Sequence, residues 1–190
     1  MLESIYNFDF AVLDWIREHL TCGFLDATMP VITRLANAGM IFIILAVVML
    51  FFRKWRKTGV SIAFALILGL VVCNLTIKPL VARIRPYDKS LADFGREIAL
   101  LIPPEKDFSF PSGHTIAAFE FATALTIRKP KWGIAAIVFA VVIAFSRLYL
   151  YVHYPTDVIT SVVLGVIFGA LGVVLANVAW KVADKIRAKR

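Results

Sequence analysis

Ionisable side chains of the kinds that handle phosphate gather at three places in this chain. They are cations, histidines and one carboxylate: Lys78 and Arg85, then His114, then Arg147, His153 and Asp157. Lysine and arginine supply permanent positive charge, and the arginine guanidinium matches two phosphate oxygens at once. If the fold brings the three places together, these residues predict a site for a phosphate group.

The two histidines add proton and covalent chemistry to that site. One imidazole can attack phosphorus while the other protonates the leaving oxygen. Asp157 follows His153 by four residues, so in a helix that starts at Pro155 its carboxylate can accept the Nδ1 proton and leave Nε2 nucleophilic. We expect nearby cations to lower the pKa of His153 and Asp157 to oppose that shift.

The segment Pro111-Ser112-Gly113-His114 predicts the start of a helix. Unpaired N–H groups at a helix N-terminus favour an anion, and Gly113 without a Cβ allows a close approach. We therefore expect Ser112 and Gly113 to help hold the phosphate. Positioning and charge stabilisation are the main needs of phosphoryl transfer, and this set supplies them without a metal or other cofactor.

Three motifs in order carry a family resemblance: Lys78 with six residues to Arg85-Pro86, Pro111 to His114, and Ser146-Arg147 with five residues to His153 and three more to Asp157. Together they resemble the signature of the type 2 phosphatidic acid phosphatase family. The resemblance implies a metal-independent lipid phosphatase of the membrane. It also implies the following roles: nucleophile His153, acid His114, orienting carboxylate Asp157, and phosphate-holding Lys78, Arg85, Ser112, Gly113 and Arg147.

By the same analogy the substrate is a polyprenyl pyrophosphate such as undecaprenyl pyrophosphate, with phosphatidylglycerophosphate or phosphatidate as the alternative. A different class of function is a non-catalytic lipid transporter or scaffold, which would need the cations but no nucleophile. Taken one at a time, Lys78 and Arg147 also fit ordinary snorkelling residues at helix ends. Arg83 is either a cation behind the site or an interfacial anchor. For mid-helix Glu120 we favour a structural hydrogen bond within the bundle, and the alternatives are that it tunes His114 or pairs with a basic residue.

The elements that must position these residues are membrane helices. Of the 190 residues, 60% are apolar and 18% charged, whereas soluble domains average about 45–50% and about 25%. Uncharged runs cover residues 35–52, 58–77, 132–146 and 158–180, and a fifth candidate covers 112–127. A spanning helix needs about 20 apolar residues and must pair its backbone internally. We predict an all-α bundle, residues 1–190 forming one membrane-embedded domain with its motifs in 78–157.

The N-terminal 36 residues follow a different pattern. An apolar face recurs at helical spacing: Ile5, Phe8, Val12, Trp15, Ile16 and Leu20. An amphipathic helix of this kind suits the membrane interface. The alternative is a sixth span formed with residues 24–36, which carry Asp26, Pro30 and Arg34.

The distribution of basic residues predicts the orientation. Twelve of the 21 lie after alternate spans: Arg53, Lys54, Arg56, Lys57, Arg128, Lys129, Lys131, Lys181, Lys185, Arg187, Lys189 and Arg190. Cytoplasmic loops carry such an excess, so the three motifs face outward. The net charge of +8 therefore marks a membrane side and a phosphate site, and we expect no nucleic-acid partner. Gly165 and Gly169 favour close helix packing, with a homodimer as the alternative.

Overall fold

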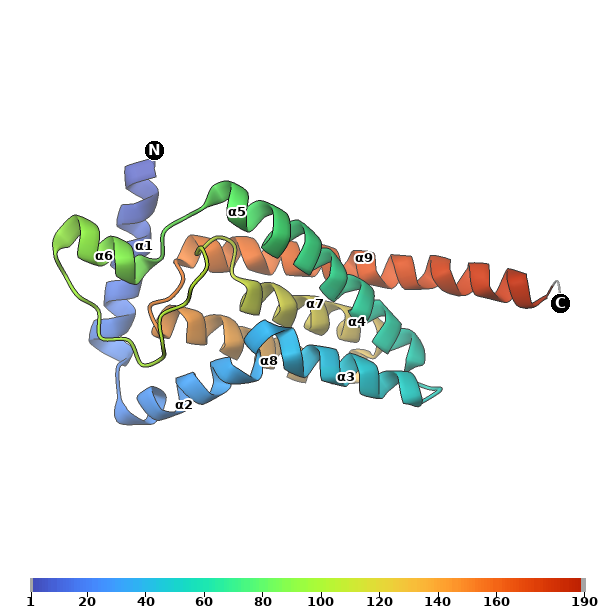
Figure 1. The fold of residues 1–190 in the computed structure, drawn as a ribbon. Coiled ribbons are helices and arrows are strands. Elements are labelled where there is room, and N and C mark those ends of the chain that lie inside the picture. Colours follow the sequence, from blue (N-terminus) through green and yellow to red (C-terminus); the bar gives the residue numbers. More distant parts are fainter. Residues whose placement is uncertain (1, 189–190) are drawn as a thin grey trace.

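The computed structural model describes residues 2–188, and their regular structure is helical (Figure 1). Two residues of the predicted basic tail, Lys189 and Arg190, lie outside the described range. The helices are α1 (Leu2–Leu20), α2 (Gly23–Leu35), α3 (Met40–Phe51), α4 (Arg56–Gly69), α5 (Lys78–Val81), α6 (Pro86–Phe94), α7 (Gly113–Arg128), α8 (Pro130–Tyr149) and α9 (Pro155–Arg187). The short 3-10 helix η1 (Asn37–Gly39) joins α2 to α3, and the π-helical η2 (Leu70–Ile77) joins α4 to α5.

Helix α7 is the centre of the bundle and packs against α4, α8 and α9. Its small residues Ala118, Ala122 and Ala124 are fully buried. On the α9 side the approach is close because that helix carries glycine at the contact: a Cβ at Gly165 would stand 2.7 Å from that of Phe119. A Cβ at Gly169 would likewise meet α7, at Thr123. The predicted role in close packing is confirmed within one chain, and these glycines do not support the homodimer alternative.

The predicted apolar run 35–52 does not form one straight helix. Helices α2 and α3 are bent by 42° at a break around Asn37–Gly39. Ala38 and Gly39 have φ values of +50° and +68°, which prevent α2 from continuing into α3 because a right-handed helix needs negative φ. Hydropathy alone did not reveal this break, since Ala38 and Gly39 do not interrupt an uncharged run.

Three helical stretches are long and apolar enough to cross a membrane: Arg56–Phe94, Pro130–Tyr149 and Pro155–Arg187. The bent α2–α3 pair gives a fourth if it counts as one span. The protein is therefore a multi-pass membrane protein, but the predicted five or six spans are not confirmed. Helix α7 has 16 residues, about 24 Å at 1.5 Å per residue, against a hydrocarbon core of about 30 Å.

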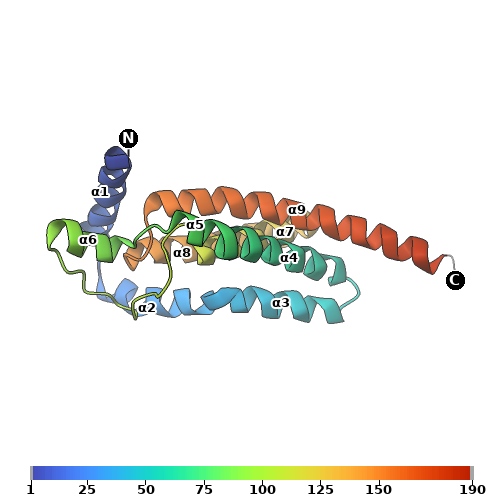
Figure 2. The ribbon, with the colours of Figure 1, turned by 45° about the horizontal axis from the view of Figure 1, so that its top comes forward.

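Helix α1 lies across the end of the bundle rather than along it (Figures 1 and 2). Its predicted apolar face is divided between two environments. Ile5, Phe8 and Trp15 are exposed, whereas Ile16 is buried against the rest of the protein. The outer side of α1 suits the membrane interface, and its inner side closes the end of the bundle that carries the motifs.

Candidate active site

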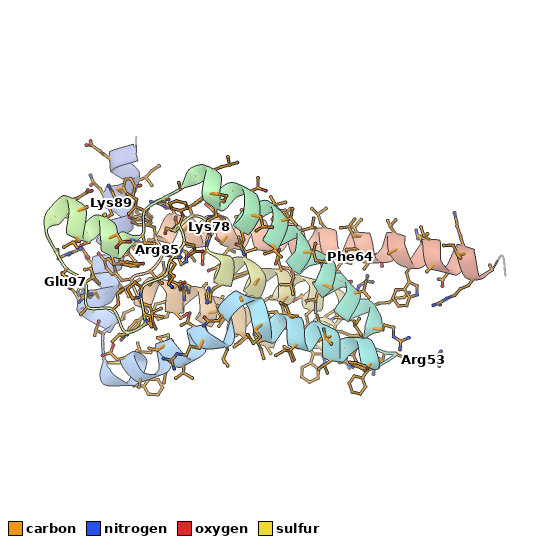
Figure 3. The ribbon with its side chains drawn as sticks, in the orientation of Figure 1. Arg53, Phe64, Lys78, Arg85, Lys89 and Glu97 are labelled. Carbon is orange, nitrogen blue, oxygen red and sulfur yellow. The ribbon has the colours of Figure 1, made fainter. Side chains whose placement is uncertain are left out.

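The three motifs come together at one end of the bundle. Figure 3 shows Lys78 and Arg85 near this end and Arg53 at the other. A cavity of about 490 Å³ opens here, and its polar lining includes six predicted residues: Lys78, Arg85, Gly113, His114, Arg147 and His153. Helix ends explain the convergence, because η2–α5, α7, α8 and α9 each place a motif at the same level of the bundle.

His153 lies in the turn between α8 and α9 and is 1% exposed. Its Nε2 is 3.3 Å from Nη1 of Arg85, and its Nδ1 is 3.5 Å from Oδ2 of Asp157. A guanidinium only donates hydrogen bonds, so Nε2 must carry the lone pair and Nδ1 the proton. This Nδ1 separation is longer than an ordinary hydrogen bond, and Nδ1 has no hydrogen-bond partner among the described residues, so acceptance of its proton by Asp157 stays a prediction.

The environment of His153 favours its neutral form. Burial lowers its pKa well below 6.5, and the positive charges of Arg85, Arg147 and Lys78 lower it further. The negative charge of Asp107 acts in the opposite direction. A neutral imidazole with an unprotonated Nε2 is the nucleophilic form.

Asp157 is fully buried in the first turn of α9. Its Oδ1 accepts a hydrogen bond from Arg83 at 2.5 Å. Its Oδ2 accepts from the Ser109 hydroxyl and, at 3.1 Å, from the Tyr154 amide. These bonds leave Oδ2 facing His153. The structure thus places Arg83 behind the site, and Ser109 is a neighbour that the motifs did not indicate.

Two carboxylates of the 95–112 loop cover the predicted phosphate-holding cations. Asp107 pairs with Lys78 at 2.6 Å and with Arg85 at 2.5 Å, and Glu105 pairs with Arg147 at 2.5 Å. Burial alone would raise the pKa of Asp107, but the bond from Lys78 and the charge of Arg85 outweigh it and lower the pKa to about 2. The cations are thus arranged around anionic oxygens before any phosphate binds.

His114 stands at the start of α7 and lines the same cavity. Its Nε2 is 3.0 Å from Oδ1 of Asn37, a residue of the break between α2 and α3. The break therefore brings a hydrogen-bonding partner to the predicted acid. Nothing in the motifs pointed to Asn37, which lies 77 residues away in the chain.

At the N-terminus of α7, Gly113 lies beside the cavity as expected, but Ser112 is buried away from it. Gly113 begins the helix beside the cavity, and its N–H belongs to the first turn, where no intrahelical partner exists. The N-cap Ser112, however, is fully buried: its N–H donates to Ser161 at 2.8 Å and its Oγ lies 2.9 Å from the Thr115 hydroxyl. Phosphate binding by Ser112 stays a prediction, whereas its present contacts cap the helix and join it to α9.

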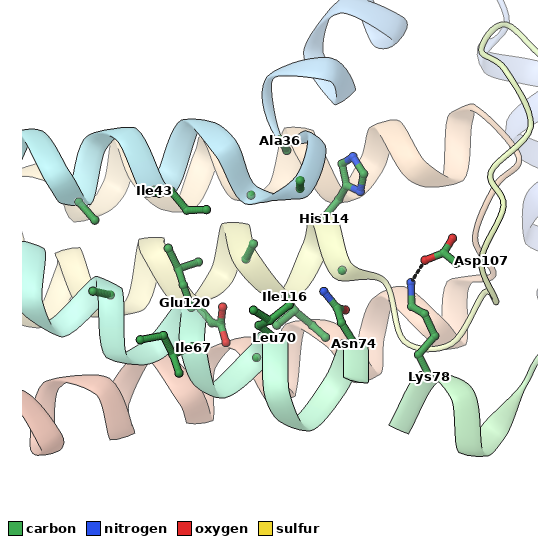
Figure 4. Close-up of a pocket in the computed structure, with 18 of the residues that line it drawn as sticks. Ala36, Ile43, Ile67, Leu70, Asn74, Lys78, Asp107, His114, Ile116 and Glu120 are labelled. Carbon is green, nitrogen blue, oxygen red and sulfur yellow. Dashed lines mark hydrogen bonds and ion pairs between the residues drawn. The ribbon is translucent and has the colours of Figure 1, made fainter. Parts of the chain in front are cut away.

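Beyond the polar end, the cavity continues as an apolar groove between α3 and α4 with α7 as its floor (Figure 4). Ile43, Ile67 and Leu70 line it along the helices. Two polar side chains from different depths, Asn74 and the 1%-exposed Glu120, also reach this groove. A second depression of about 590 Å³ shares His114, Glu105 and Asp107 with the first and is bordered by residues 102–107. The site is thus reached by an apolar route and by a more polar one.

Comparison with known proteins decides the family. The PAP2 superfamily model matches residues 58–181, which include all three motifs. The chain belongs to the PAP2 superfamily. This confirms the resemblance that the motifs carry. A solved structure has a similar fold: the crystal structure of Aquifex aeolicus LpxE superposes with a TM-score of 0.74 at 26% identity, covering 87% of this chain and 94% of that one.

Two curated relatives are similar in sequence to this PAP2 protein. One is the undecaprenyl-diphosphatase BcrC of Bacillus subtilis, 33% identical over 77% of this chain and 72% of its own length. The other is an undecaprenyl-diphosphatase of Sulfolobus acidocaldarius, 32% identical over 66% of this chain and 58% of its own length. The similarity to the Sulfolobus protein therefore spans under two thirds of that relative.

Proposed function

We propose that this protein is a membrane lipid phosphatase that acts through a phosphohistidine on His153. The observation that carries the proposal is the position of that ring: Nε2 lies 3.3 Å from Nη1 of Arg85 in the cation cluster, while Nδ1 lies 3.5 Å from Oδ2 of Asp157. A site that only bound phosphate would need the cations but not this orientation.

In the first step Nε2 of His153 attacks phosphorus and forms the N–P bond. The bond from phosphorus to the leaving oxygen breaks, and that oxygen takes a proton from the imidazolium form of His114, which the negative charge of the bound phosphate favours. Lys78, Arg85 and Arg147 stabilise the charge that develops on the phosphoryl oxygens, once these oxygens replace Asp107 and Glu105.

In the second step a water molecule attacks the phosphohistidine. His114, now neutral, takes the proton of that water, the N–P bond breaks, and inorganic phosphate leaves with His153 restored. Asp157 holds the Nδ1 proton throughout, which stabilises the imidazole as charge develops on it.

The groove between α3 and α4 supports a lipid as the substrate. It leads from the cation cluster along apolar side chains, as a phosphate group with a long hydrocarbon tail requires. Undecaprenyl pyrophosphate is our first candidate because the two curated relatives carry that substrate in their names. Phosphatidylglycerophosphate and phosphatidate stay as alternatives, since the motifs recognise phosphate rather than the tail.

The proposed topology has five crossings, with α1 in the interface. Helix α7 begins at the site, and its last residue Arg128 hydrogen-bonds Ser61 of α4 and Asn177 of α9 near the opposite end. It therefore runs through the same layer as α4 and α9 despite its length. The basic loops then lie in the cytoplasm and the site faces outward.

A phosphate-release assay tests the function. Purified full-length protein is given undecaprenyl pyrophosphate, phosphatidylglycerophosphate and phosphatidate in one detergent, beside His153→Ala and the control His19→Ala, whose side chain is exposed on α1. We expect release by wild type and control, fastest with the polyprenyl substrate, and background rates for His153→Ala. Vanadate should inhibit, and a chelator should leave the rate unchanged.

Near wild-type release by a folded His153→Ala protein would contradict the nucleophile. A wild type that binds these lipids without releasing phosphate would favour the transporter or scaffold instead. Faster release from a glycerophospholipid would keep the phosphatase and change the substrate.

A further inference from the structure

Helix α1 contributes a fully buried carboxylate to the catalytic end of the bundle. Asp9 is 0% exposed, and its Oδ1 accepts a hydrogen bond from the Thr156 amide at 2.9 Å. Its Oδ2 accepts from the Thr156 hydroxyl at 2.7 Å and from Nη2 of Arg83 at 2.6 Å. A buried charge is tolerated only when it is paired and hydrogen-bonded, so this residue has a defined partner set.

Arg83 connects that carboxylate to the site. Its Nη1 donates to Oδ1 of Asp157 at 2.5 Å, while Nη2 is held by Asp9. Aromatic rings confine the guanidinium as well: its carbon lies 3.8 Å from the ring centre of Tyr154 and 4.9 Å from that of Tyr6, also on α1. A continuous chain of contacts thus runs from Asp9 through Arg83 and Asp157 to His153.

We infer that Asp9 is a positioning residue for the nucleophile, acting through Arg83 on Asp157. This inference rests on the proposed function. Arg83 lies between two carboxylates and divides its positive charge between them. With Asp9 present, Asp157 keeps enough negative charge to hold the Nδ1 proton of His153. Without it, the whole charge of Arg83 falls on Asp157, which becomes a weaker acceptor for His153.

Asp14 on the same helix provides a matched control. Its carboxylate pairs with Arg96 at 2.9 Å and accepts a hydrogen bond from the Tyr151 hydroxyl at 2.7 Å. It therefore also fastens α1 to the bundle, but its bonds go to neither Arg83 nor Asp157. An effect of loosened docking alone would appear in Asp14→Asn as well as in Asp9→Asn.

The first measurement separates kcat from KM for the best lipid substrate. In Asp9→Asn we expect kcat to fall about 10- to 100-fold, the size of effect that a misplaced catalytic group produces. KM should stay within about twofold, because Lys78, Arg85 and Arg147 are untouched. Asp14→Asn should retain the wild-type kcat. Asp9→Glu keeps the negative charge but moves it by one methylene, so its loss of kcat should be intermediate. This variant takes the place of Asp9→Asn if Asp9→Asn does not fold.

The second measurement does not depend on turnover. Imidazole ¹⁵N NMR of the protein, with His153 assigned by its substitution, reports through the Nδ1 chemical shift how strongly the Nδ1–H interacts with Asp157. Wild type and Asp14→Asn should share one Nδ1 shift, and in Asp9→Asn that shift should move toward the value of an N–H with no acceptor. An unchanged Nδ1 shift and kcat in Asp9→Asn, or equal changes in Asp14→Asn, would overturn the inference. Failure of the wild type to release phosphate would instead refute the proposed function, while the NMR comparison would still decide the role of Asp9.

Discussion

At the scale of single residues, the site depends on keeping one imidazole neutral among three cations. Burial and the charges of Arg85, Arg147 and Lys78 lower the pKa of His153 below its ordinary 6.5, so the neutral form persists as the pH falls. We predict that kcat/KM is maintained at pH 6.5 and that its acid limb lies below that value. A pH–rate profile with the best lipid substrate measures this. An acid limb centred at pH 7 or above would contradict it.

Asp107 pairs with both Lys78 and Arg85, so in the proposed mechanism substrate oxygens must replace its carboxylate there. Its pKa of about 2 keeps the Asp107 carboxylate ionised at every working pH. Only a substitution can therefore stop it from competing with substrate oxygens for these two cations. In Asp107→Asn we predict that KM and the vanadate inhibition constant fall about tenfold, equivalent to about 1.4 kcal/mol. The control is Asp93→Asn, which breaks only the ion pair with Lys89 on α6. Weaker vanadate binding in Asp107→Asn would refute the competition.

At the scale of elements, the break between α2 and α3 has a chemical consequence. It brings Asn37 within 3.0 Å of His114, the proposed acid. Asn37→Ala should lower kcat for a lipid substrate about tenfold, because an unoriented acid protonates the leaving oxygen less often. It should hardly affect p-nitrophenyl phosphate, whose leaving group departs without a proton. Equal losses on both substrates would show that Asn37 acts on something other than the acid.

The contact between α7 and α9 makes a separate prediction about stability. A Cβ at Gly165 would lie 2.9 Å from the Ile116 carbonyl oxygen as well as against Phe119. Gly165→Ala should therefore destabilise the fold by about 1–3 kcal/mol, seen as a lower Tm in detergent. Gly23→Ala is the control, because nothing lies within 4 Å of its added Cβ. Equal Tm values for the two variants would mean that α7 and α9 can move apart with little loss of stability.

At the scale of the whole molecule, the bundle has a basic end and a catalytic end. Arg53 lies at the first, and Lys89 and Glu97 lie at the second (Figure 3). Replacing the exposed Cys22 by serine leaves only the buried Cys73 as a native cysteine. In this Cys22→Ser background, Asp93→Cys should react with an impermeant maleimide added to intact cells, because α6 lies at the end that we propose to face outward. Lys54→Cys should react only after permeabilisation. The reverse pattern would place the proposed active site in the cytoplasm.

Much of this architecture could be predicted because its causes are local in the sequence. Long uncharged runs predicted helices α4, α8 and α9. The lipid interior requires apolar side chains and a backbone whose N–H and C=O groups hydrogen-bond to one another within the segment. The spacing of the motifs predicted a helix that starts at Pro155 with Asp157 within reach of His153; α9 starts there, and the two side chains are 3.5 Å apart.

The family, the helical class and the candidate residues for handling phosphate could thus be predicted from the amino-acid sequence, because each depends on residue type at short spacing. The surroundings of those residues became known only from the packing of the helices. Asp107 reaches the site from a loop and Asn37 from a helix break, while Asp9 reaches Arg83 behind the site from a distant helix. Their positions depend on how separate helices pack, and a carboxylate or amide in the sequence carries no sign of which buried cation or histidine it will meet.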